Sequence, residues 1–196
     1  MFICAGNGEE FDFAQSIGVG LVESAINLTR LCQREKPAFL IFVGSAGSYD
    51  LNLPLLEFYL SKEATQIEQG FLLDQSYTPI AQSVKSVQKD VSYETIDTLK
   101  ALKFPQVIVN SSNYITTDLA SAQAMCKRGI LLENMEFFSV LSVANTFCVP
   151  ALGVFCVSNY CHPKAHEEFV RNRGEVMGRI SEMMIKIKIF DLNKHK

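Results

Sequence analysis

Short apolar runs alternate along this chain with longer segments whose apolar residues repeat at helical spacing. The runs at 39–43 and 107–110 carry no charge and are rich in β-branched and aromatic residues, as strands buried on both faces are. Residues 22–33, 117–127 and 164–189 have the spacing of amphipathic helices. Alternating strands and helices favour a sheet covered by helices on both sides. The sequence therefore predicts an α/β protein of three layers, α/β/α, with a mostly parallel mixed central sheet.

Other short segments complete this predicted fold. Five small residues at 44–48, Gly-Ser-Ala-Gly-Ser, are expected to form a loop after the strand at 39–43. Further strands are expected at 2–5, 55–60, 64–70 and 130–132, and a further helix at 93–102.

The size and composition of the chain favour one domain. Of its 196 residues, 48% are hydrophobic and 20% are charged, which supplies enough apolar side chains for a core. The sequence contains no internal repeat, low-complexity stretch or linker-like segment. We therefore expect residues 1–196 to form a single domain.

Charge and cysteine content indicate the compartment and the kind of partner. The formal net charge is −3 without a basic stripe, which argues against binding to nucleic acid. The six cysteines form no CxxC pair and lie mostly in apolar runs, so we expect free thiols in a reducing compartment. No signal peptide is visible at the N-terminus. The sequence thus predicts a cytoplasmic protein.

One segment has the length and apolar character of a membrane span. Residues 137–157 carry no charge, but Asn145 and Pro150 interrupt the stretch, and its second half is rich in β-branched and aromatic residues. These features favour a helix, a turn and a buried strand over a span. We expect no membrane association.

Polar or small residues follow four of the predicted strands, at 44–48, 111–114, 133–136 and 158–160. Open α/β sheets bind ligands beyond the carboxyl ends of their strands. Strands commonly end in polar turns, so a single cluster would mean little. Four clusters in succession predict a binding site at this edge of the sheet.

The content and order of these clusters resemble the nucleoside phosphorylase/nucleosidase family, which includes bacterial purine nucleoside phosphorylase and methylthioadenosine nucleosidase. The resemblance rests on IGVGLVESAINL at 17–28, FVGSAGSYD at 42–50, NSSNYI at 110–115 and the Met-Glu block ENMEFFSVLSVANTFCVPALGVFCVSN at 133–159. The family usually places more strands ahead of the first motif, so the chain resembles an N-terminally shortened member.

The resemblance assigns roles to residues of three motifs. Glu136 would accept hydrogen bonds from the ribose hydroxyls, since a carboxylate can take two donors, and Met135 would pack under the sugar. Tyr114 would stack on the base, which would also face the backbone of Asn134. The pocket for the attacking nucleophile would be formed by Ser45 and the amides of Ala46 and Gly47. On residue type alone, Tyr114 could instead be a core residue and Ser45 a turn residue.

Asn159 departs from the bacterial purine enzymes, which have an Asp after the final strand. An amide cannot donate a titratable proton, but it can hydrogen-bond the leaving base at a carbonyl oxygen and at N7. The trimeric enzymes for 6-oxopurines are similar in using Asn. Asn159 is therefore consistent with a hypoxanthine- or guanine-type base, and equally with weakened catalysis.

Two further departures from the family pattern leave open whether phosphate or water accepts the sugar. Bacterial phosphorylases place an arginine before the GSAG-like loop, where this chain has Val43. Either Glu9 or Glu10 could replace the N-terminal glutamate with which nucleosidases activate water, although both could equally lie in a solvated loop. The missing arginine favours hydrolysis, and Asn159 favours a phosphorylase.

His162 and His166 have a spacing that could hold a metal on a helix, but Pro163 lies between them and no acidic ligand is fixed nearby. We expect no metal and no cofactor.

The resemblance implies an enzyme of purine nucleoside metabolism or salvage. The expected reaction is cleavage of the N-glycosidic bond of a purine nucleoside, with a 6-oxopurine favoured, and with phosphate as co-substrate to give free base and ribose 1-phosphate. The alternatives are a nucleosidase that uses water and a nucleoside-binding protein with weakened or lost turnover. Family members are homo-oligomers, commonly dimers or hexamers, so we expect a homo-oligomer.

Overall fold

The computed structural model describes residues 1–88 and 103–193, with side chains up to Ile187. In this part of the chain nine strands join one sheet. The strands are β1 (Phe2–Cys4), β2 (Gln15–Ser16), β3 (Leu40–Ser48), β4 (Phe58–Ser61), β5 (Glu63–Thr65), β6 (Ser83–Lys85), β7 (Ile108–Asn110), β8 (Ile130–Glu133) and β9 (Ala151–Tyr160). The helices are α1 (Gly20–Glu35), α2 (Gln69–Leu72), α4 (Leu119–Lys127), α5 (Phe137–Thr146) and α6 (Ala165–Asn193).

Strands β3 and β9 form the centre of the sheet. They run parallel from the pair Leu40–Ala151 to the pair Ser48–Tyr160, and almost every residue of both is buried. Strands buried on both faces need apolar side chains on both, which explains their near-continuous apolar runs. The first half of β3 also pairs with β1, and the carboxyl end of β3 pairs with the end of β8. The sheet therefore branches at β3.

Most pairs in the sheet are parallel. β1 pairs in parallel with β2 and β3, β3 with β9, β5 with β7, and β7 with β8. The antiparallel pairs are β3 with β8, β4 with β9, and β5 with β6.

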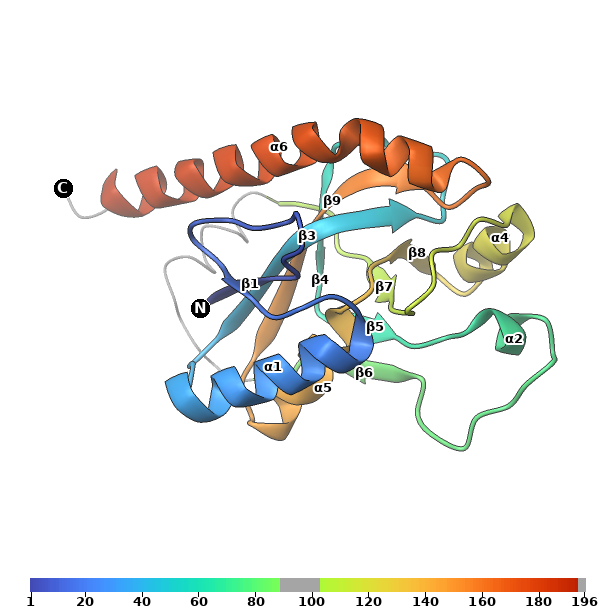
Figure 1. The fold of residues 1–196 in the computed structure, drawn as a ribbon, viewed down its shortest axis with the longest axis horizontal. Coiled ribbons are helices and arrows are strands. Elements are labelled where there is room, and N and C mark those ends of the chain that lie inside the picture. Colours follow the sequence, from blue (N-terminus) through green and yellow to red (C-terminus); the bar gives the residue numbers. More distant parts are fainter. Residues whose placement is uncertain (89–102, 194–196) are drawn as a thin grey trace.

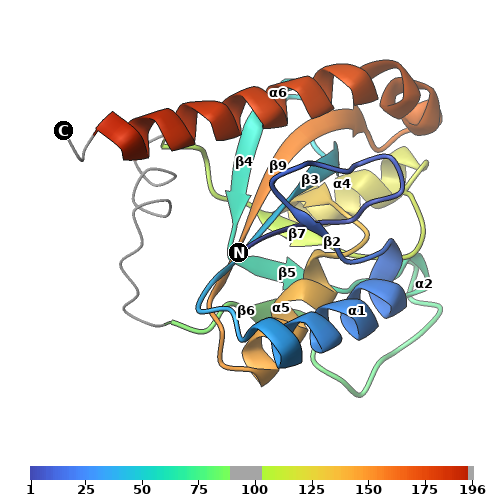
Figure 2. The same cartoon turned by 60° about the vertical axis from the view of Figure 1, so that its left-hand side comes forward.

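Helices cover the sheet on both faces (Figures 1 and 2): α1 and α5 on one, and α6 on the other. Side chains of β3 alternate between these layers, as the two-residue period of a strand requires. Phe42 packs in the cluster that contains residues of α1 and α5, whereas Ile41 and Val43 pack in the cluster that contains residues of α6. The predicted three-layer α/β/α class with a mostly parallel sheet is confirmed.

The expected loop at 44–48 is wrong, because these residues are the second half of β3. Small residues there indicated a turn, but each of them pairs with the long neighbouring strand β9. The buried backbone groups of β9 require hydrogen-bond partners, and this pairing supplies them.

Other element predictions differ mainly in their bounds. The strand expected at 55–60 is β4, and the one expected at 64–70 is only β5, followed by the short helix α2. The helix, turn and strand predicted for 137–157 are confirmed as α5 and β9. The helix expected at 93–102 lies outside the described residues. Among the described helices, none combines the length and apolar character that crossing a membrane requires.

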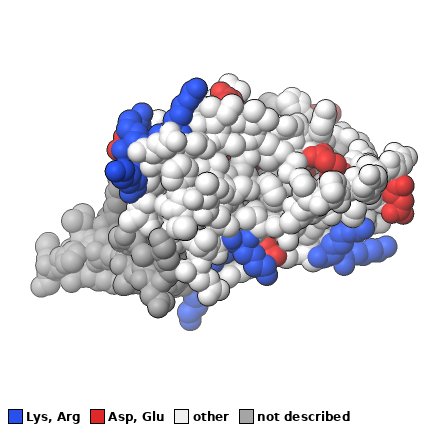
Figure 3. Space-filling view, turned by 90° about the horizontal axis from the view of Figure 1, so that it is seen from below, with Lys and Arg blue, Asp and Glu red and all other residues white. Residues whose placement is uncertain are grey.

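Charged side chains lie in small, scattered groups on the face shown in Figure 3, and some basic groups lie directly beside acidic ones. This view therefore shows no continuous basic stripe, in keeping with the sequence.

Gly153 in β9 provides a test of the core. The rings of Phe137 and Phe155 meet edge to face with centroids 5.1 Å apart. A Cβ at Gly153 would lie 2.4 Å from a Phe155 ring carbon and 2.8 Å from a Phe137 ring carbon. We predict that Gly153→Ala lowers the free energy of unfolding by about 1–3 kcal/mol, because overpacking forces these rings to shift.

The matched control is Gly178→Ala on α6, where a Cβ would meet no atom of the described chain within 4 Å. This change should raise the free energy of unfolding by about 0.5–1 kcal/mol, since alanine favours a helix over glycine. Urea denaturation measures both. Equal stability of Gly153→Ala and the parent protein would contradict the packing described here.

Candidate active site

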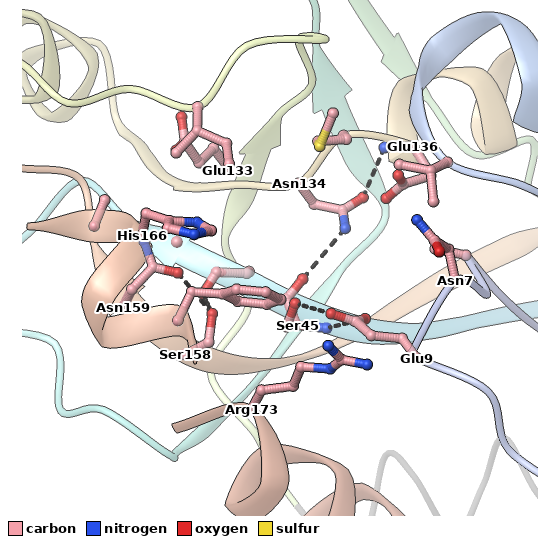
Figure 4. Close-up of a pocket in the computed structure, with 18 of the residues that line it drawn as sticks. Asn7, Glu9, Ser45, Glu133, Asn134, Glu136, Ser158, Asn159, His166 and Arg173 are labelled. Carbon is pink, nitrogen blue, oxygen red and sulfur yellow. Dashed lines mark hydrogen bonds between the residues drawn. The ribbon is translucent and has the colours of Figure 1, made fainter. Parts of the chain in front are cut away.

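A cavity of about 250 Å³ lies where the carboxyl ends of β3, β8 and β9 meet (Figure 4). Residues of all four clusters predicted from the sequence line it, together with residues of the loop after β1 and of α6. The lining residues used below are Asn7, Glu9, Ser45, Ala46, Gly47, Tyr114, Glu133, Asn134, Met135, Glu136, Ser158, Asn159, His166, Phe169 and Arg173.

A bulge in the central strand pair shapes one wall. The pairing passes from Ala46–Val157 directly to Gly47–Asn159, so no residue of β3 stands opposite Ser158. Neighbouring residues of a regular strand point to opposite faces, and a bulge breaks that alternation. Both Ser158 and Asn159 consequently line the cavity.

Glu136 lies at the opposite end of the cavity from Asn159 (Figure 4). It is 3% exposed, and its Oε1 accepts a 2.9 Å hydrogen bond from the amide of Gly20, the first residue of α1. Amides at a helix N-terminus lack intrahelical partners and favour negative charge. The predicted Gly-x-Gly segment therefore holds the glutamate of the predicted Met-Glu pair, and Met135 beside it also lines the cavity.

The ionisation of Glu136 is strongly perturbed. Burial raises the pKa of Glu136 to about 7, the negative charge of Glu9 adds to this increase, and the hydrogen bonds from Gly20 and Asn134 oppose it. At neutral pH the free protein therefore contains both protonated and ionised Glu136. Two hydroxyl donors from a ligand would favour the ionised form.

The side chain of Asn134 fixes the turn into α5. Its Oδ1 accepts from the amides of Glu136 and Phe137, each at 3.0 Å, and its Nδ2 donates to the carbonyl oxygen of Ser45 at 3.2 Å. The side chain of Asn134 thus links the end of β8 to β3. The sequence had predicted a role only for the backbone of Asn134, facing the base.

Glu9 enters the cavity and contacts Ser45. The amide of Ser45 donates to Glu9 Oε2 at 3.0 Å, and its hydroxyl donates to Glu9 Oε1. Gly44 leaves room for this carboxylate, because a Cβ there would lie 3.3 Å from Glu9 Oε2. Glu10 is exposed and does not line the cavity. Of the two candidate glutamates, the structure therefore places Glu9 in the site.

Asn159 lies at the other end of the cavity, with both of its polar atoms engaged. Its Oδ1 accepts from the Ser158 hydroxyl at 2.7 Å, and its Nδ2 donates to the Tyr160 carbonyl at 3.2 Å. An amide nitrogen has two protons and an amide oxygen two acceptor positions, so one of each is still available to a ligand.

Glu133 is a second buried carboxyl in this wall, and sequence reasoning assigned it no role. Its Oε1 accepts from the amide of Thr116 at 3.1 Å, and desolvation by burial raises the pKa of Glu133. Its Cγ and the Nδ2 of Asn159 would each lie 3.1 Å from a Cβ at Gly47. Glu133 and Asn159 therefore converge over the same glycine.

Tyr114 lines the mouth of the cavity and is 80% exposed. The possibility that it is a core residue is therefore wrong. Three further lining residues, His166, Phe169 and Arg173, come from α6. The sequence marked His166 only as half of a histidine pair, and no local motif marks Phe169 or Arg173. Residues scattered along one amphipathic helix reach the cavity only through the packing of that helix on the sheet.

His162 and His166 have different surroundings in the structure. His162 Nε2 lies 3.3 Å from a carboxylate oxygen of Glu168, while His166 lines the cavity. Among the residues that the structure describes, no group of three His, Cys, Asp or Glu side chains could hold a metal ion.

Comparison with known proteins identifies the family to which the chain belongs. The model of the phosphorylase superfamily matches residues 13–187. The 5'-methylthioadenosine/S-adenosylhomocysteine nucleosidase of Staphylococcus haemolyticus (strain JCSC1435) is 24% identical over 198 residues, covering 92% of this chain and 83% of that protein.

Two solved structures share the fold at low sequence identity. A mutant of the Helicobacter pylori 5'-methylthioadenosine/S-adenosylhomocysteine nucleosidase, with 5'-methylthioadenosine in its active site, has a TM-score of 0.76 at 13% identity, covering 95% of this chain and 96% of that one. A mutant of the futalosine hydrolase of Helicobacter pylori strain 26695 has a TM-score of 0.77 at 12% identity, covering 95% and 96%.

The raised pKa of Glu136 predicts an effect on stability. A carboxyl whose pKa is about 7 in the folded protein and about 4.5 when unfolded is neutral in both states at low pH, and it destabilises the fold as the pH rises from about 4.5 through 7. We predict that Glu136→Gln raises the free energy of unfolding at pH 8 by up to about 3 kcal/mol, and changes it little at pH 4.

Urea titrations of both proteins at pH 4 and pH 8 test this expectation. Glu182→Gln, an exposed position on α6, is the control and should leave the pH dependence unchanged. A Glu136→Gln variant with the same pH dependence as the parent protein would show that the buried carboxyl is ionised without penalty.

Proposed function

Since the chain belongs to the phosphorylase superfamily, we propose that it hydrolyses the N-glycosidic bond of a purine nucleoside. The products would be the free base and the free sugar. The observation that carries the proposal is the contact between Glu9 and Ser45, in which a carboxylate takes both the amide and the hydroxyl of Ser45.

This contact favours water over phosphate as the acceptor. Ser45 supplies the donors that a phosphate would be expected to use, and a phosphate dianion would have to displace Glu9 and remain beside its charge. A neutral water can instead donate a hydrogen bond to Glu9, which then serves as general base. Phosphate as co-substrate was the first expectation from the sequence, and the named relatives, two nucleosidases and a hydrolase, favour its hydrolytic alternative.

The sugar would lie between Met135 and Glu136. The Gly20 amide occupies one side of the Glu136 carboxylate, which leaves its remaining acceptor positions to the two ribose hydroxyls. As the glycosidic bond breaks, the sugar develops positive charge, which the carboxylates of Glu9 and the buried Glu136 would stabilise.

Asn159 would hydrogen-bond the departing base. In the proposed step the oxygen of water bonds to C1' of the sugar, Glu9 takes a proton from that water, and the electron pair of the C1'–N bond leaves with the base. The base gains a proton from solvent. Asn159 offers one donor and one acceptor. It can donate to the carbonyl oxygen of a 6-oxopurine and accept from N7–H once that nitrogen has gained its proton, or it can donate to N7 of an adenine and accept from the amino group.

Phosphorolysis is the second candidate, since the cationic side chain of Arg173 lines the cavity and could attract an anion. A nucleoside-binding protein without turnover is a third, because Asn159 cannot act as an acid. Whichever of these functions holds, the homo-oligomer expected from the resemblance stays a prediction.

A panel of nucleosides tests the proposed reaction. Inosine, guanosine, adenosine, uridine and 5'-methylthioadenosine are each incubated with the protein, with and without phosphate, and the free base and the sugar product are measured. We predict release of a purine base and free sugar at a rate that phosphate leaves unchanged. A strict requirement for phosphate with formation of the sugar 1-phosphate would refute hydrolysis. Tight binding without release of base would identify the binding protein.

The role of Glu9 is tested by Glu9→Gln, with Glu10→Gln as a matched control one residue away. Loss of a positioned general base typically costs 10²–10⁴-fold in rate, so we predict a decrease in kcat of about that size for Glu9→Gln. The exposed neighbour Glu10 should tolerate the same change. Equal kcat values for the two variants would remove Glu9 from the mechanism.

A further inference from the structure

The loop that carries Glu9 has an unusual backbone. Gly6, Asn7 and Gly8 have φ angles of +87°, +51° and +95°, so three consecutive residues adopt left-handed conformations. Such conformations are costly for a non-glycine residue and persist when surrounding contacts hold them. The amide of Glu9 donates to the carbonyl of Gly6 at 3.3 Å, which closes the turn but does not tie it to the rest of the molecule.

Arg173 of α6 supplies a contact from outside the loop. Its Nε and Nη2 donate to the carbonyl oxygen of Gly8 at 3.1 Å and 2.8 Å. A Cβ at Gly8 would lie 1.7 Å from Nη2, so the guanidinium occupies the space that any side chain there would need. Gly8 precedes Glu9 directly, and hydrogen bonds from a charged donor are stronger than those between neutral groups.

We infer that Arg173 is a positioning residue that holds Glu9 against Ser45. The inference rests on the proposed role of Glu9 and adds the residue that sets its geometry. Figure 4 shows the Arg173 side chain extending from α6 toward Glu9, on the side of the cavity away from Glu136. Glu9 is thus fixed from two directions: its carboxylate by Ser45 of β3, and its backbone by Arg173 of α6.

Because Arg173 is exposed, its proposed positioning role can be distinguished by experiment from a contribution to the stability of the fold. Its side chain is exposed, and exposed charged contacts contribute little to the free energy of unfolding. Its loss should therefore leave the thermal midpoint almost unchanged. A displacement of a general base by about 1 Å, by contrast, can cost roughly 10²-fold in rate.

The first test measures kcat and KM of Arg173→Ala on the nucleoside that the parent protein cleaves fastest. We expect kcat to fall about 10- to 100-fold while KM for the nucleoside changes little, because the sugar and base contacts are elsewhere in the cavity. Arg173→Lys keeps the charge without the fork of donors and should recover part of the loss. Arg171→Ala is the matched control on the same helix, since Arg171 does not line the cavity.

A double-mutant cycle tests whether Arg173 acts through Glu9. In the Glu9→Gln background, Arg173→Ala should reduce kcat by less than about 2-fold, because residues that act as a unit are not additive. Losses that simply multiply would overturn the inference. An increase in KM for phosphate in Arg173→Ala, with kcat preserved, would instead make Arg173 a phosphate ligand and overturn it as well.

Hydrogen exchange distinguishes failure of this inference from failure of the proposed function. Amides of residues 6–13 should exchange faster in Arg173→Ala than in the parent protein, while those of β9 stay unchanged. If no nucleoside is cleaved but this difference is present, the hydrolytic function fails and the contact stands. If nucleosides are cleaved and neither exchange nor kcat changes, Arg173 has no positioning role.

Discussion

The parallel pairing of β3 with β9 determines where every part of the candidate site lies. Nine residue pairs join the two strands, and burial on both faces fixes their register, because a slip of one residue would move Phe42 from one helical layer to the other. The bulge at Ser158 then interrupts the pairing near its carboxyl end. The same pairing thus builds the core over most of its length and the wall of the cavity at its end, where Gly47 meets Asn159.

Hydrogen bonds between distant segments complete the site on this framework. The amide of Gly20 and the carboxylate of Glu136 are 116 residues apart, Ser45 and Glu9 are 36 apart, and Asn134 and Ser45 are 89 apart. Each joins a segment adjoining a strand or helix to another element, so each can form only after the sheet has brought both ends together. The geometry of the cavity is therefore a property of the whole fold and cannot be assigned to one motif.

This dependence explains what the sequence could predict. Apolar periodicity was sufficient for the α/β class, and the Met-Glu block was sufficient to place Glu136 in a site. Periodicity could not show that residues 44–48 continue β3, because their small side chains fit a turn as well as a strand, and the partner that decides lies more than a hundred residues away. Arg173 carries no local signal either, since its position follows from the packing of α6. For Glu9 the sequence left two adjacent candidates, and only the contact with Ser45 separates them.

The distribution of charge in the cavity connects stability with the proposed reaction. Glu9, Glu133 and Glu136 all line it, and burial disfavours the ionised forms of Glu133 and Glu136 in the free protein. A carboxyl whose pKa is raised to about 7 costs the free protein stability at neutral pH. The proposed function gives Glu136 a use in the bound state. That use follows from the chemistry: cleavage of a glycosidic bond makes the sugar cationic for a moment, and carboxylates that are poorly solvated beforehand interact most strongly with that charge. The same negative field disfavours a phosphate dianion and leaves a neutral water unaffected. The electrostatic cost borne by the free protein and the proposed preference for water as acceptor would thus have one physical origin.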